Sequence, residues 1–458
     1  MKRKVALLLM AAMAASALSA CSSSSENATG GTSSTAESST VEATAESTEG
    51  SSGASANLTM AWWGNQVRNE RTQQIIDLYC EQNPGVTIDG QFSEWSDYWN
   101  KLATAAAGDS MPDIVQMDYM YLTQYVENGL LVDLTPYIED GTIDTSDCNQ
   151  DVLEAGAIDG KVYALCNGVN APALVYNKTL LDENGITVKD NMTWDEFVDV
   201  CKEIYEKTGY KTNIAYGTND QWVSYYLRAF DIVLYQEGKL GGDSAEHYID
   251  FFKQYEDGLA EGWVIDPAVF AERTIGSVEQ DPLVYGSSPE TMSWCSFEWS
   301  NMLTSSMAAA PEGMELGMIT YPSPDSKKSN YLKPSQFFAI STDSKNPDEA
   351  AKILNFITNS LDCNNILLGE RGIPLSSSVA EAISDKLDEG SQRAITYIND
   401  VVSPNSSKIN PPNALGYSEV NDLIKKLQEK VCYGEITAEE AGNQLFEQGN
   451  KIMAEAAE

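Results

Sequence analysis

The sequence predicts an α/β protein in which helices cover a parallel β-sheet, and three observations lead to this class. From Leu58 onward, short apolar segments of strand length alternate with longer segments that carry apolar residues at helical spacing. The chain has 458 residues, of which 42% are hydrophobic, so it can bury a large core in more than one domain. The segment at 22–57 is poor in large apolar residues and is expected to lie outside the folded part.

The first elements of the folded part follow a β-α-β-α-β order. They are a strand at 58–63, a helix at 68–80, a strand at 86–89, a helix at 99–107 and a strand at 113–117. The turn formers Asn83, Pro84 and Gly85 separate the first helix from the second strand. Because parallel neighbours need a crossover connection, this order predicts a parallel sheet with helices on its faces.

Capping signals mark the starts of later helices. Thr193 with Glu196 has the spacing of a capping box. Asn346 followed by Pro347 places a capping residue before a proline at the first helical position. The sequence at 437–440 opens the last helix. Between these helices we expect strands at 162–165, 173–176, 214–216, 315–319 and 337–340.

The N-terminal region predicts export and a tether. Basic residues at 2–4 precede an apolar stretch at 5–18 that is too short to span a bilayer, which predicts a signal peptide over residues 1–20. The small residues before Cys21 resemble a bacterial lipobox, and this resemblance implies cleavage before Cys21 and lipidation of its thiol. Residues 21–57 are rich in Ser, Thr, Glu and Gly, and after Cys21 they lack Lys, Arg and aromatic residues, so we expect a flexible, lipidated linker.

Composition argues against several functional classes. The formal net charge is −39, which argues against binding to nucleic acid and to anionic membrane surfaces.

The cysteines and the histidine narrow the chemistry further. Eight Cys without a Cys-x-x-Cys pair give no support to a zinc ribbon or a redox motif. Beyond Cys21 we expect free, buried thiols, with a disulfide framework as the alternative. His247 is the only histidine, so His-dependent catalysis is not expected, although carboxylate-only catalysis stays open. We expect no cofactor and no metal, because no EF-hand spacing is found.

Short motifs distributed over the folded part carry a family resemblance. They lie at 83–86, 107–115 (AGDSMPDIV), 128–134, 160–178, 193–197 (TWDEF), 344–351 and 372–374. In order and spacing they resemble the family 1 extracellular solute-binding proteins of carbohydrate ABC importers, over Leu58 to about Met453. Cys166 stands where that family usually has proline.

The resemblance implies a two-lobed, periplasmic-binding-protein-like fold of type II, with the ligand cleft between the lobes. Lobe one is then expected at 58–165 plus 286–322, and lobe two at 167–285 plus 335–458. Chain crossings are expected near 165–170, 283–288 and 322–335. The implied function is that of a monomeric lipoprotein on the extracellular face of the bacterial cell membrane. It would bind an oligosaccharide and deliver it to the permease subunits of an ABC transporter, without being an enzyme.

Aromatic and acidic residues at strand ends are the first candidate ligand contacts. Sugars need flat aromatic side chains against the ring and carboxylates or amides around the hydroxyls. Trp62 and Trp63 end the first strand and face opposite ways, so one can lie in the core and one at the ligand. Asp118 and Tyr119 follow the strand at 113–117, at the end where open α/β sheets bind ligands. For Asp118 the alternative is a helix cap.

The other candidates lie in loops, crossings and later segments. Trp95 lies in the loop after the second strand, and Asn170 lies at the first crossing, where a turn residue is the alternative. Trp222 begins an aromatic run that either contacts the ligand or packs inside lobe two. The segment SWCSFEW, which corresponds to the family's second entry into lobe one, supplies Trp294, Glu298 and Trp299.

Two arginines extend the resemblance to binders of the oligogalacturonide type. Arg68 follows a Trp-Trp-Gly sequence, and Arg371 lies in the sequence ERGIP, as in that subgroup. A guanidinium pairs with a carboxylate through two hydrogen bonds, so Arg68 or Arg371 is a candidate reader of a uronate. The alternative is an ordinary salt bridge in an acid-rich protein.

Two other functions stay open on the sequence. An extracellular glycoside hydrolase needs two carboxylates about 5–10 Å apart, for which Glu94, Asp118 and Glu298 are candidates. The regular repeats of a β/α barrel are not found, and cleavage of an oligosaccharide would identify such an enzyme. An adhesion lipoprotein without a small ligand is the second alternative, and it would show no ligand-induced change in melting temperature.

Overall fold

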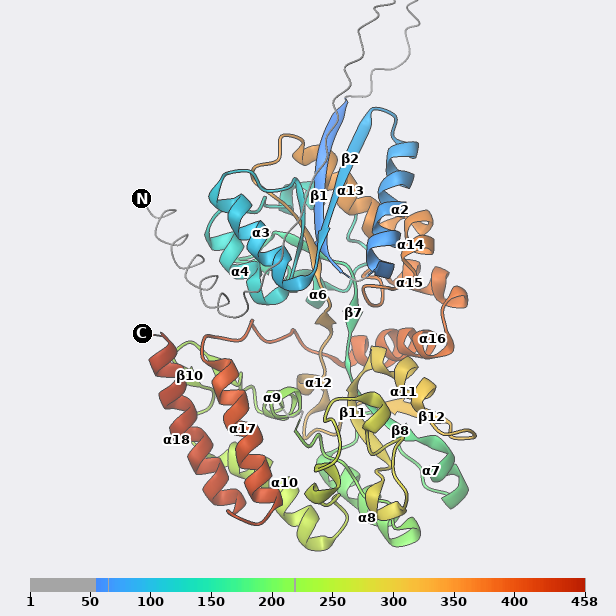
Figure 1. The fold of residues 1–458 in the computed structure, drawn as a ribbon, viewed down its shortest axis with the longest axis vertical. Helices are drawn as coiled ribbons and strands as arrows, with labels where there is room; N and C mark the ends of the chain where they lie inside the picture. Colours follow the sequence, from blue (N-terminus) through green and yellow to red (C-terminus); the bar gives the residue numbers. More distant parts are fainter. Residues whose placement is uncertain (1–54, 65, 218–219, 458) are drawn as a thin grey trace, which may run out of the picture.

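The computed structural model describes residues 55–64, 66–217 and 220–457, which form two lobes, each with its own β-sheet (Figure 1). The predicted signal peptide at 1–20, Cys21 and nearly all of the predicted linker lie outside the described residues. The first strand begins at Ala56, slightly before the expected start. Helices alternate with strands and cover the sheets, which confirms the predicted α/β class.

The sheet of lobe one has the strand order β2-β1-β3-β14-β6. Its strands are β1 (Ala56–Trp63), β2 (Val86–Ser93), β3 (Ile114–Met117), β14 (Phe337–Ile340) and β6 (Ala164–Cys166). β2 and β3 run parallel to β1, as predicted. β14 is antiparallel to β3 and to β6, because the chain enters it from lobe two and not through a crossover helix. The sheet is therefore mixed.

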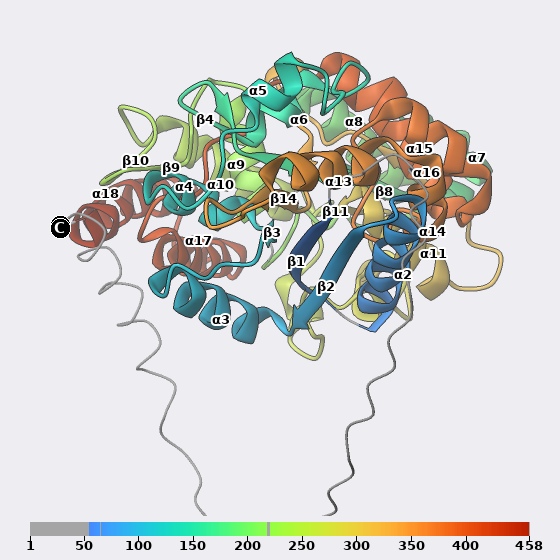
Figure 2. The ribbon, with the colours of Figure 1, turned by 90° about the horizontal axis from the view of Figure 1, so that it is seen from above.

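Helices cover both faces of this sheet (Figure 2). They are α2 (Gln66–Gln82), α3 (Trp95–Ala107), α4 (Tyr119–Glu127), α5 (Thr135–Glu139), α6 (Gln150–Ala155), α13 (Pro347–Asn359), α14 (Leu361–Leu367) and α15 (Ser377–Ile383). Trp62 belongs to the core that β1 forms with α2 and α13, whereas Trp63 belongs to the core on the side of α3 and α4. The two side chains therefore face opposite ways, as predicted.

Lobe two is built around a three-stranded antiparallel sheet. Its central strand β8 (Pro172–Asn177) pairs with β11 (Cys295–Trp299) and with β12 (Leu316–Ile319). The surrounding helices are α7 (Lys178–Asn184), α8 (Trp194–Thr208), α9 (Asp220–Arg228), α10 (Glu246–Glu261), α11 (Leu303–Ala309), α12 (Ser326–Ser329), α17 (Tyr417–Cys432) and α18 (Ala438–Ala457). Two short hairpins, β4 with β5 (157–158 and 161–162) and β9 with β10 (235–236 and 239–240), lie outside the main sheets.

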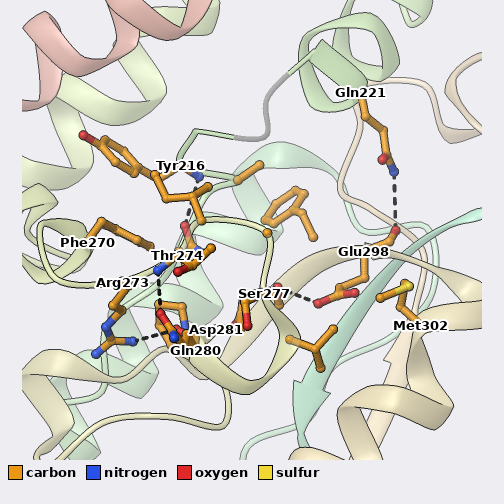
Figure 3. A pocket seen from close by; sticks show the side chains of 18 of the residues that line it. Tyr216, Gln221, Phe270, Arg273, Thr274, Ser277, Gln280, Asp281, Glu298 and Met302 are labelled. Atoms are coloured by element: carbon orange, nitrogen blue, oxygen red, sulfur yellow. Dashed lines mark hydrogen bonds between the residues drawn. The ribbon is translucent and has the colours of Figure 1, made fainter. Parts of the chain in front are cut away.

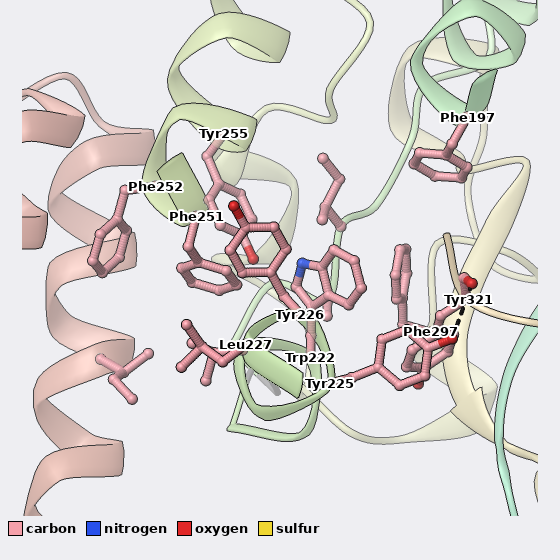
Figure 4. Packing of buried hydrophobic residues seen from close by; sticks show 14 of the residues in the cluster. Phe197, Trp222, Tyr225, Tyr226, Leu227, Phe251, Phe252, Tyr255, Phe297 and Tyr321 are labelled. Carbon is pink, nitrogen blue, oxygen red and sulfur yellow. Dashed lines mark hydrogen bonds between the residues drawn. The ribbon is translucent and has the colours of Figure 1, made fainter. Parts of the chain in front are cut away.

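An aromatic core holds lobe two together (Figure 4). Trp222 of α9 lies inside it, with ring centroids of Phe297 at 4.9 Å and Tyr321 at 5.9 Å. The indole N–H of Trp222 donates to Gln254 Oε1 at 3.1 Å, so its polar atom is satisfied inside the lobe. The core therefore ties α9 to α10 and to the central sheet.

The described chain passes between the lobes along three routes. The first runs through β7 (Val169–Asn170) and the second through β13 (Lys333–Pro334), and these two strands pair with each other at the hinge. Both match predicted crossings. The third runs from α15 through α16 (Glu389–Thr396) and onward to α17, and it was not predicted.

The predicted lobe boundaries are wrong in the second half of the chain. Residues 286–322 were expected in lobe one, but their strands β11 and β12 pair with β8 in lobe two. The region from 335 was expected in lobe two, but β14 pairs with β3 and β6, and α13 to α15 follow it in lobe one. Leu283 packs against Val175 in a small core of lobe two, so the chain does not cross there. A sequence pattern identifies a strand but not its partner.

Predictions of local structure agree with the observed structure better than the predicted lobe boundaries do. The capping box of Thr193 and Glu196 is formed with both of its hydrogen bonds. Asn346 precedes α13, but its side chain donates to the backbone carbonyl of Asn57 instead of capping the helix. The segment 214–216 is not a strand: residues 214 and 215 have no regular structure, and Tyr216 begins a turn.

Candidate functional site

A pocket of about 340 Å³, which we call the interlobe pocket, lies where both lobes meet the hinge. Lobe one lines it with Asp118, Tyr119 and Met120, and the second crossing lines it with Tyr331, Lys333 and Pro334. Lobe two contributes Gln221, Ser224, Arg228, Tyr235, Trp299 and Tyr417, and the third crossing contributes residues 409–413. A molecule bound in this pocket would therefore contact both lobes at once.

Asp118 caps a helix and also lines the interlobe pocket. Its Oδ1 accepts the Met120 N–H at 2.9 Å and so caps α4. Burial raises the pKa of Asp118, and the charge of Lys333 acts in the opposite direction. Because the cap uses one carboxylate oxygen, the other can accept a hydrogen bond from a ligand hydroxyl.

Trp299 ends β11 and lines the interlobe pocket and a second pocket beside it. The Nζ of Lys333 lies 5.1 Å from the indole centroid, and the Tyr331 ring lies edge-on at 6.2 Å. The next residue, Ser300, donates its N–H to the carbonyl of Ala171 at 2.8 Å, and the Ala171 N–H donates to Ser300 Oγ. The backbone beside Trp299 is thus attached to the first crossing, and its indole, an apolar ring, lines both pockets.

The second pocket, which we call the lobe-two pocket, has a volume of about 230 Å³ (Figure 3). Its walls are the loop after Phe270, the end of β11 and the chain around Tyr216. The rings of Tyr216 and Phe270 stack with centroids 4.5 Å apart and an interplanar angle of 21°. Gln221 and Trp299 line both pockets, so the two pockets are adjacent, and we refer to them together as the groove.

Two carboxylates in the lobe-two pocket share one serine hydroxyl. Ser296 Oγ lies 3.0 Å from Asp281 Oδ2 and 3.3 Å from Glu298 Oε1. Burial raises the pKa of Glu298 to about 7, and the neighbouring Asp281 adds to the effect. Burial also raises the pKa of Asp281 to about 6. Near neutral pH this pair retains part of a proton, so it can donate to a ligand hydroxyl as well as accept from one.

The Glu298 carboxyl gives a prediction about stability and pH. Its pKa is higher in the folded protein, at about 7, than the ordinary value of 4.5, so the folded state binds more protons between these pH values. Stability therefore falls as pH rises through this window. We expect the unfolding free energy of Glu298→Gln, measured relative to that of the wild type, to be higher at pH 8 than at pH 5. The increase between the two pH values should be about 2 kcal/mol. Urea unfolding at the two pH values measures this difference.

Glu312→Gln is the matched control, because Glu312 is exposed on the surface. That variant should change stability equally at both pH values. If Glu298→Gln also gave the same change at pH 5 and pH 8, the carboxyl of Glu298 would not carry a raised pKa.

An aromatic cluster lies at the ends of β1 and β2. The Trp63 ring lies 4.9 Å from the Trp95 ring and 5.5 Å from the Trp99 ring, and Tyr121 lies 4.1 Å from Trp99. The carboxyl ends of β1 and β2 point toward lobe two (Figure 1). Trp95, which is 39% exposed, is therefore on the side of lobe one that faces lobe two, although it lines neither pocket described above.

Comparison with known proteins accounts for this architecture. Residues 74–394, more than half of the chain, match the family model of bacterial extracellular solute-binding proteins. The chain belongs to this family. Two sheets joined by a hinge, with a groove between the lobes, are thus the framework of a solute-binding protein.

Individual relatives agree with this assignment. A carbohydrate ABC transporter substrate-binding protein of Streptococcus pneumoniae is 24% identical over 309 residues, which cover 64% of this chain and 60% of the relative. A family 1 extracellular solute-binding protein of Alicyclobacillus acidocaldarius matches in structure with a TM-score of 0.80 and 24% identity, over 88% of this chain and 100% of that one. A periplasmic oligogalacturonide-binding protein of Yersinia enterocolitica matches with a TM-score of 0.72 and 20% identity, over 88% and 100% of the two chains. These structures confirm the predicted fold.

The described part of this solute-binding protein contains no helix that is long and apolar enough to cross a membrane. It also contains no group of three or more His, Cys, Asp or Glu side chains arranged to hold a metal ion. The seven cysteines within it are free, and four are buried, namely Cys166, Cys201, Cys295 and Cys363. Burial raises the pKa of the Cys166 thiol to about 12, which keeps it protonated and unreactive. Free thiols were the preferred prediction.

Three of the predicted contact residues lie in the cores of the solute-binding protein. Trp62 and Trp294 are fully buried, and Trp222 is 1% exposed. The indole of Trp62 donates to Asn69 Oδ1, and that of Trp294 donates to Thr212 Oγ1, both at 2.9 Å. None of the three can stack on a ligand in this conformation. Burying a large indole is favourable on either side of a strand, so residue type alone did not locate the groove.

The two predicted uronate readers form an ion-pair cluster inside lobe one. Arg68 Nε lies 2.9 and 3.0 Å from the carboxylate oxygens of Glu370, and Arg371 Nη1 lies 3.4 Å from the same group. Arg371 also donates to Gln116 Oε1 and Thr72 Oγ1. Burial lowers the pKa of Arg371 to about 9. The internal salt bridge, which was the alternative, is therefore the arrangement found.

Several groove residues were not predicted from the sequence, and only some of them carry a signal there. Tyr331 and Lys333 lie inside the predicted crossing at 322–335, so their position in a crossing could have identified them. Asp281 lies in a loop without any motif. Asn170 was predicted and lies at the hinge in β7, paired with Lys333, outside both pockets.

Proposed function

We propose that this protein captures an oligosaccharide in the groove between its lobes and delivers it to the permease of an ABC importer. One observation carries the proposal: Trp299 lies between two pockets that offer oxygen acceptors on both of its sides. A flat indole flanked by carboxylates such as Asp118 and Glu298 suits a chain of sugar rings with hydroxyl rims. The ligand classes named for the pneumococcal relative and the Yersinia neighbour support the same class here.

Among the residues considered from the sequence, four are proposed as ligand contacts. Asp118 and Tyr119 would act from lobe one, and Glu298 and Trp299 from lobe two. Trp95 is proposed to join them when the lobes approach, because it is exposed on the facing side of lobe one. These proposed contacts do not require the bound sugar to carry a carboxylate.

Ligand binding is proposed to act by favouring closure of the lobes. The lobes are joined through the β7–β13 pair, and the proposed contacts lie on both sides of this hinge. A ligand shifts the equilibrium only if it binds the closed form more tightly than the open form, and contacts to both lobes provide that difference. We propose that the permease recognises the closed form, so that closure reports an occupied site.

A thermal-shift panel of short neutral and uronic oligosaccharides tests the ligand class. A ligand at 100 times its Kd stabilises the folded protein by about 2.7 kcal/mol. For a chain of this size we expect the melting temperature to rise by about 3 °C. Differential scanning fluorimetry with the mature protein measures the shift, and the matching polyols at equal concentration control for solvent effects.

Two outcomes of this panel would contradict the proposal. If no oligosaccharide changed the melting temperature, the adhesion lipoprotein would be the better reading. If a bound oligosaccharide were shortened during incubation, the protein would be a hydrolase. We expect chromatography to recover it intact, because the chain belongs to a family of solute-binding proteins. Of the three carboxylates considered from the sequence, Asp118 and Glu298 line different pockets and Glu94 is exposed at the start of α3. The two carboxylates that lie together, Asp281 and Glu298, are bridged by Ser296.

We also propose that the protein acts as a monomer held at the extracellular face of the membrane by a lipid on Cys21. The basic, apolar and small-residue order that ends at Cys21 supports this proposal. Cells that express the wild type in the presence of radiolabelled palmitate should label the protein, and cells that express Cys21→Ser should not. Cys80→Ser keeps the proposed acceptor and should remain labelled. Equal labelling of the Cys21→Ser variant would contradict the proposed anchor.

A further inference from the structure

Residues 406–416, which we call the strap, connect the short helical turn at Ser403–Asn405 to α17 and contain neither helix nor strand. In Figure 1 the strap passes between the two lobes ahead of α17. Five of its residues, 409–413, line the interlobe pocket, and Pro411 and Pro412 lie at the centre of this stretch. The strap is therefore part of the ligand groove.

The strap is attached firmly to lobe two. Arg228 is 5% exposed, and its guanidinium donates to Asn410 Oδ1 at 2.5 Å, to Ser407 Oγ at 2.6 Å and to the carbonyl of Lys408 at 2.9 Å. The Ser407 N–H donates to the carbonyl of Asn330 at 2.9 Å. Moving the strap would leave a buried cation without most of its acceptors, which is costly.

The strap is also attached to lobe one. Tyr119 Oη donates to the backbone carbonyl of Asn410 at 2.9 Å. Asn410 is thus held by its carbonyl from lobe one and by its side chain from lobe two. Because both lobes hold the same residue, the strap is held in place as a wall of the interlobe pocket in this conformation.

The position of this wall relative to the groove is defined by the residues that line each pocket. Trp299 and Gln221 line both pockets, whereas the strap lines only the interlobe pocket. The strap therefore bounds the groove at the interlobe pocket and does not line the lobe-two pocket.

We propose that the strap closes one end of the ligand groove, so that this protein recognises the end of an oligosaccharide chain and not an internal stretch of it. This inference rests on the function proposed above. One terminal sugar lies in the interlobe pocket against Pro411 and Pro412, and the chain continues past Trp299 into the lobe-two pocket. The two prolines have no backbone N–H, so this part of the wall offers no backbone donor to a further sugar.

Modified ends of the ligand test this inference. The probe is the linear tetramer of the oligosaccharide series that gives the largest thermal shift, in three forms. One is unmodified, one is reduced to its alditol at the reducing end, and one is O-methylated on the non-reducing hydroxyl that would carry the next sugar. Isothermal titration calorimetry with the mature protein should show at least about a 30-fold loss of affinity for one modified form, a loss of about 2 kcal/mol.

The outcomes separate this inference from the proposed function. Loss at one end or at both ends supports the strap as a closing wall. Binding of both modified tetramers within about threefold of the unmodified one, about 0.6 kcal/mol, would overturn it and leave sugar binding intact. If no sugar in the panel binds at all, the proposed function fails, and the inference fails with it.

A strap variant provides a second measurement. Asn410→Ala removes the side-chain acceptor of Arg228 Nη1 while Ser407 and Lys408 keep the guanidinium partly satisfied. We expect the discrimination between modified and unmodified tetramers to fall about tenfold in this variant, or about 1.4 kcal/mol. Leu415→Ala is the control, because Leu415 lies in the strap, is 72% exposed and does not line the pocket. Unchanged discrimination in a folded Asn410→Ala protein would argue against the strap as the cause.

Discussion

Replacing Trp299 with alanine should weaken oligosaccharide binding by about 30-fold or more while the protein stays folded. Truncating an aromatic anchor at the centre of a desolvated site costs about 2 kcal/mol or more, and about 1.4 kcal/mol corresponds to a tenfold change in Kd. Trp299 lines both pockets, so a ligand that spans the groove would contact its indole over a large area. Isothermal titration calorimetry with the oligosaccharide found in the thermal-shift panel measures the loss.

The protein should tolerate this change because Trp299 lies at the edge of the aromatic core. Its indole is only partly buried, and its contacts with Tyr331 and Lys333 are at the surface of the groove. Trp194→Ala is the matched control. Trp194 is also a partly buried tryptophan of lobe two, but it lines a different surface groove, between α8 and α10. That variant should bind with unchanged affinity, and equal losses in both variants would show that the effect of Trp299 is not local.

The elements of this fold were predictable where the determining interactions are local. The breakers at 83–85 separate α2 from β2, and the capping box of Thr193 and Glu196 starts α8, as expected. The lobe assignment failed because it depends on pairing between distant segments. β14 reads as a strand in the sequence, but nothing in its own residues indicates that β3 and β6 are its partners.

The candidate site was predictable only in part for a related reason. Strand alternation correctly separated Trp62 from Trp63, but it does not say which face of the strand meets the cleft. Asp118 lines the interlobe pocket because the end of a parallel strand has a defined position in such folds, and its contact with a ligand stays a prediction. Asn410 enters the interlobe pocket through the third crossing, whose path depends on the packing of both lobes.

Replacing Trp222 with alanine should have the opposite effect, with a large loss of stability and no change in affinity. Removing a fully buried tryptophan costs about 3–5 kcal/mol, because the transfer free energy is lost and a cavity remains. Trp222 contacts the rings of Phe297 and Tyr321 inside lobe two. Its removal would also leave Gln254 Oε1, in a residue that is 5% exposed, without the indole donor. Urea unfolding followed by circular dichroism measures the loss.

Trp222→Phe separates the aromatic packing from the hydrogen bond, because it keeps a ring but loses the N–H. We expect about half of the destabilisation in this variant, since the remaining ring fills most of the site. Affinity should stay near the wild-type value in both variants at temperatures where they are folded, because Trp222 is buried behind Phe297 and lines neither pocket. A Trp222→Ala protein with wild-type stability and weakened binding would place this indole at the ligand after all. It would show that lobe two opens its core when the groove is occupied.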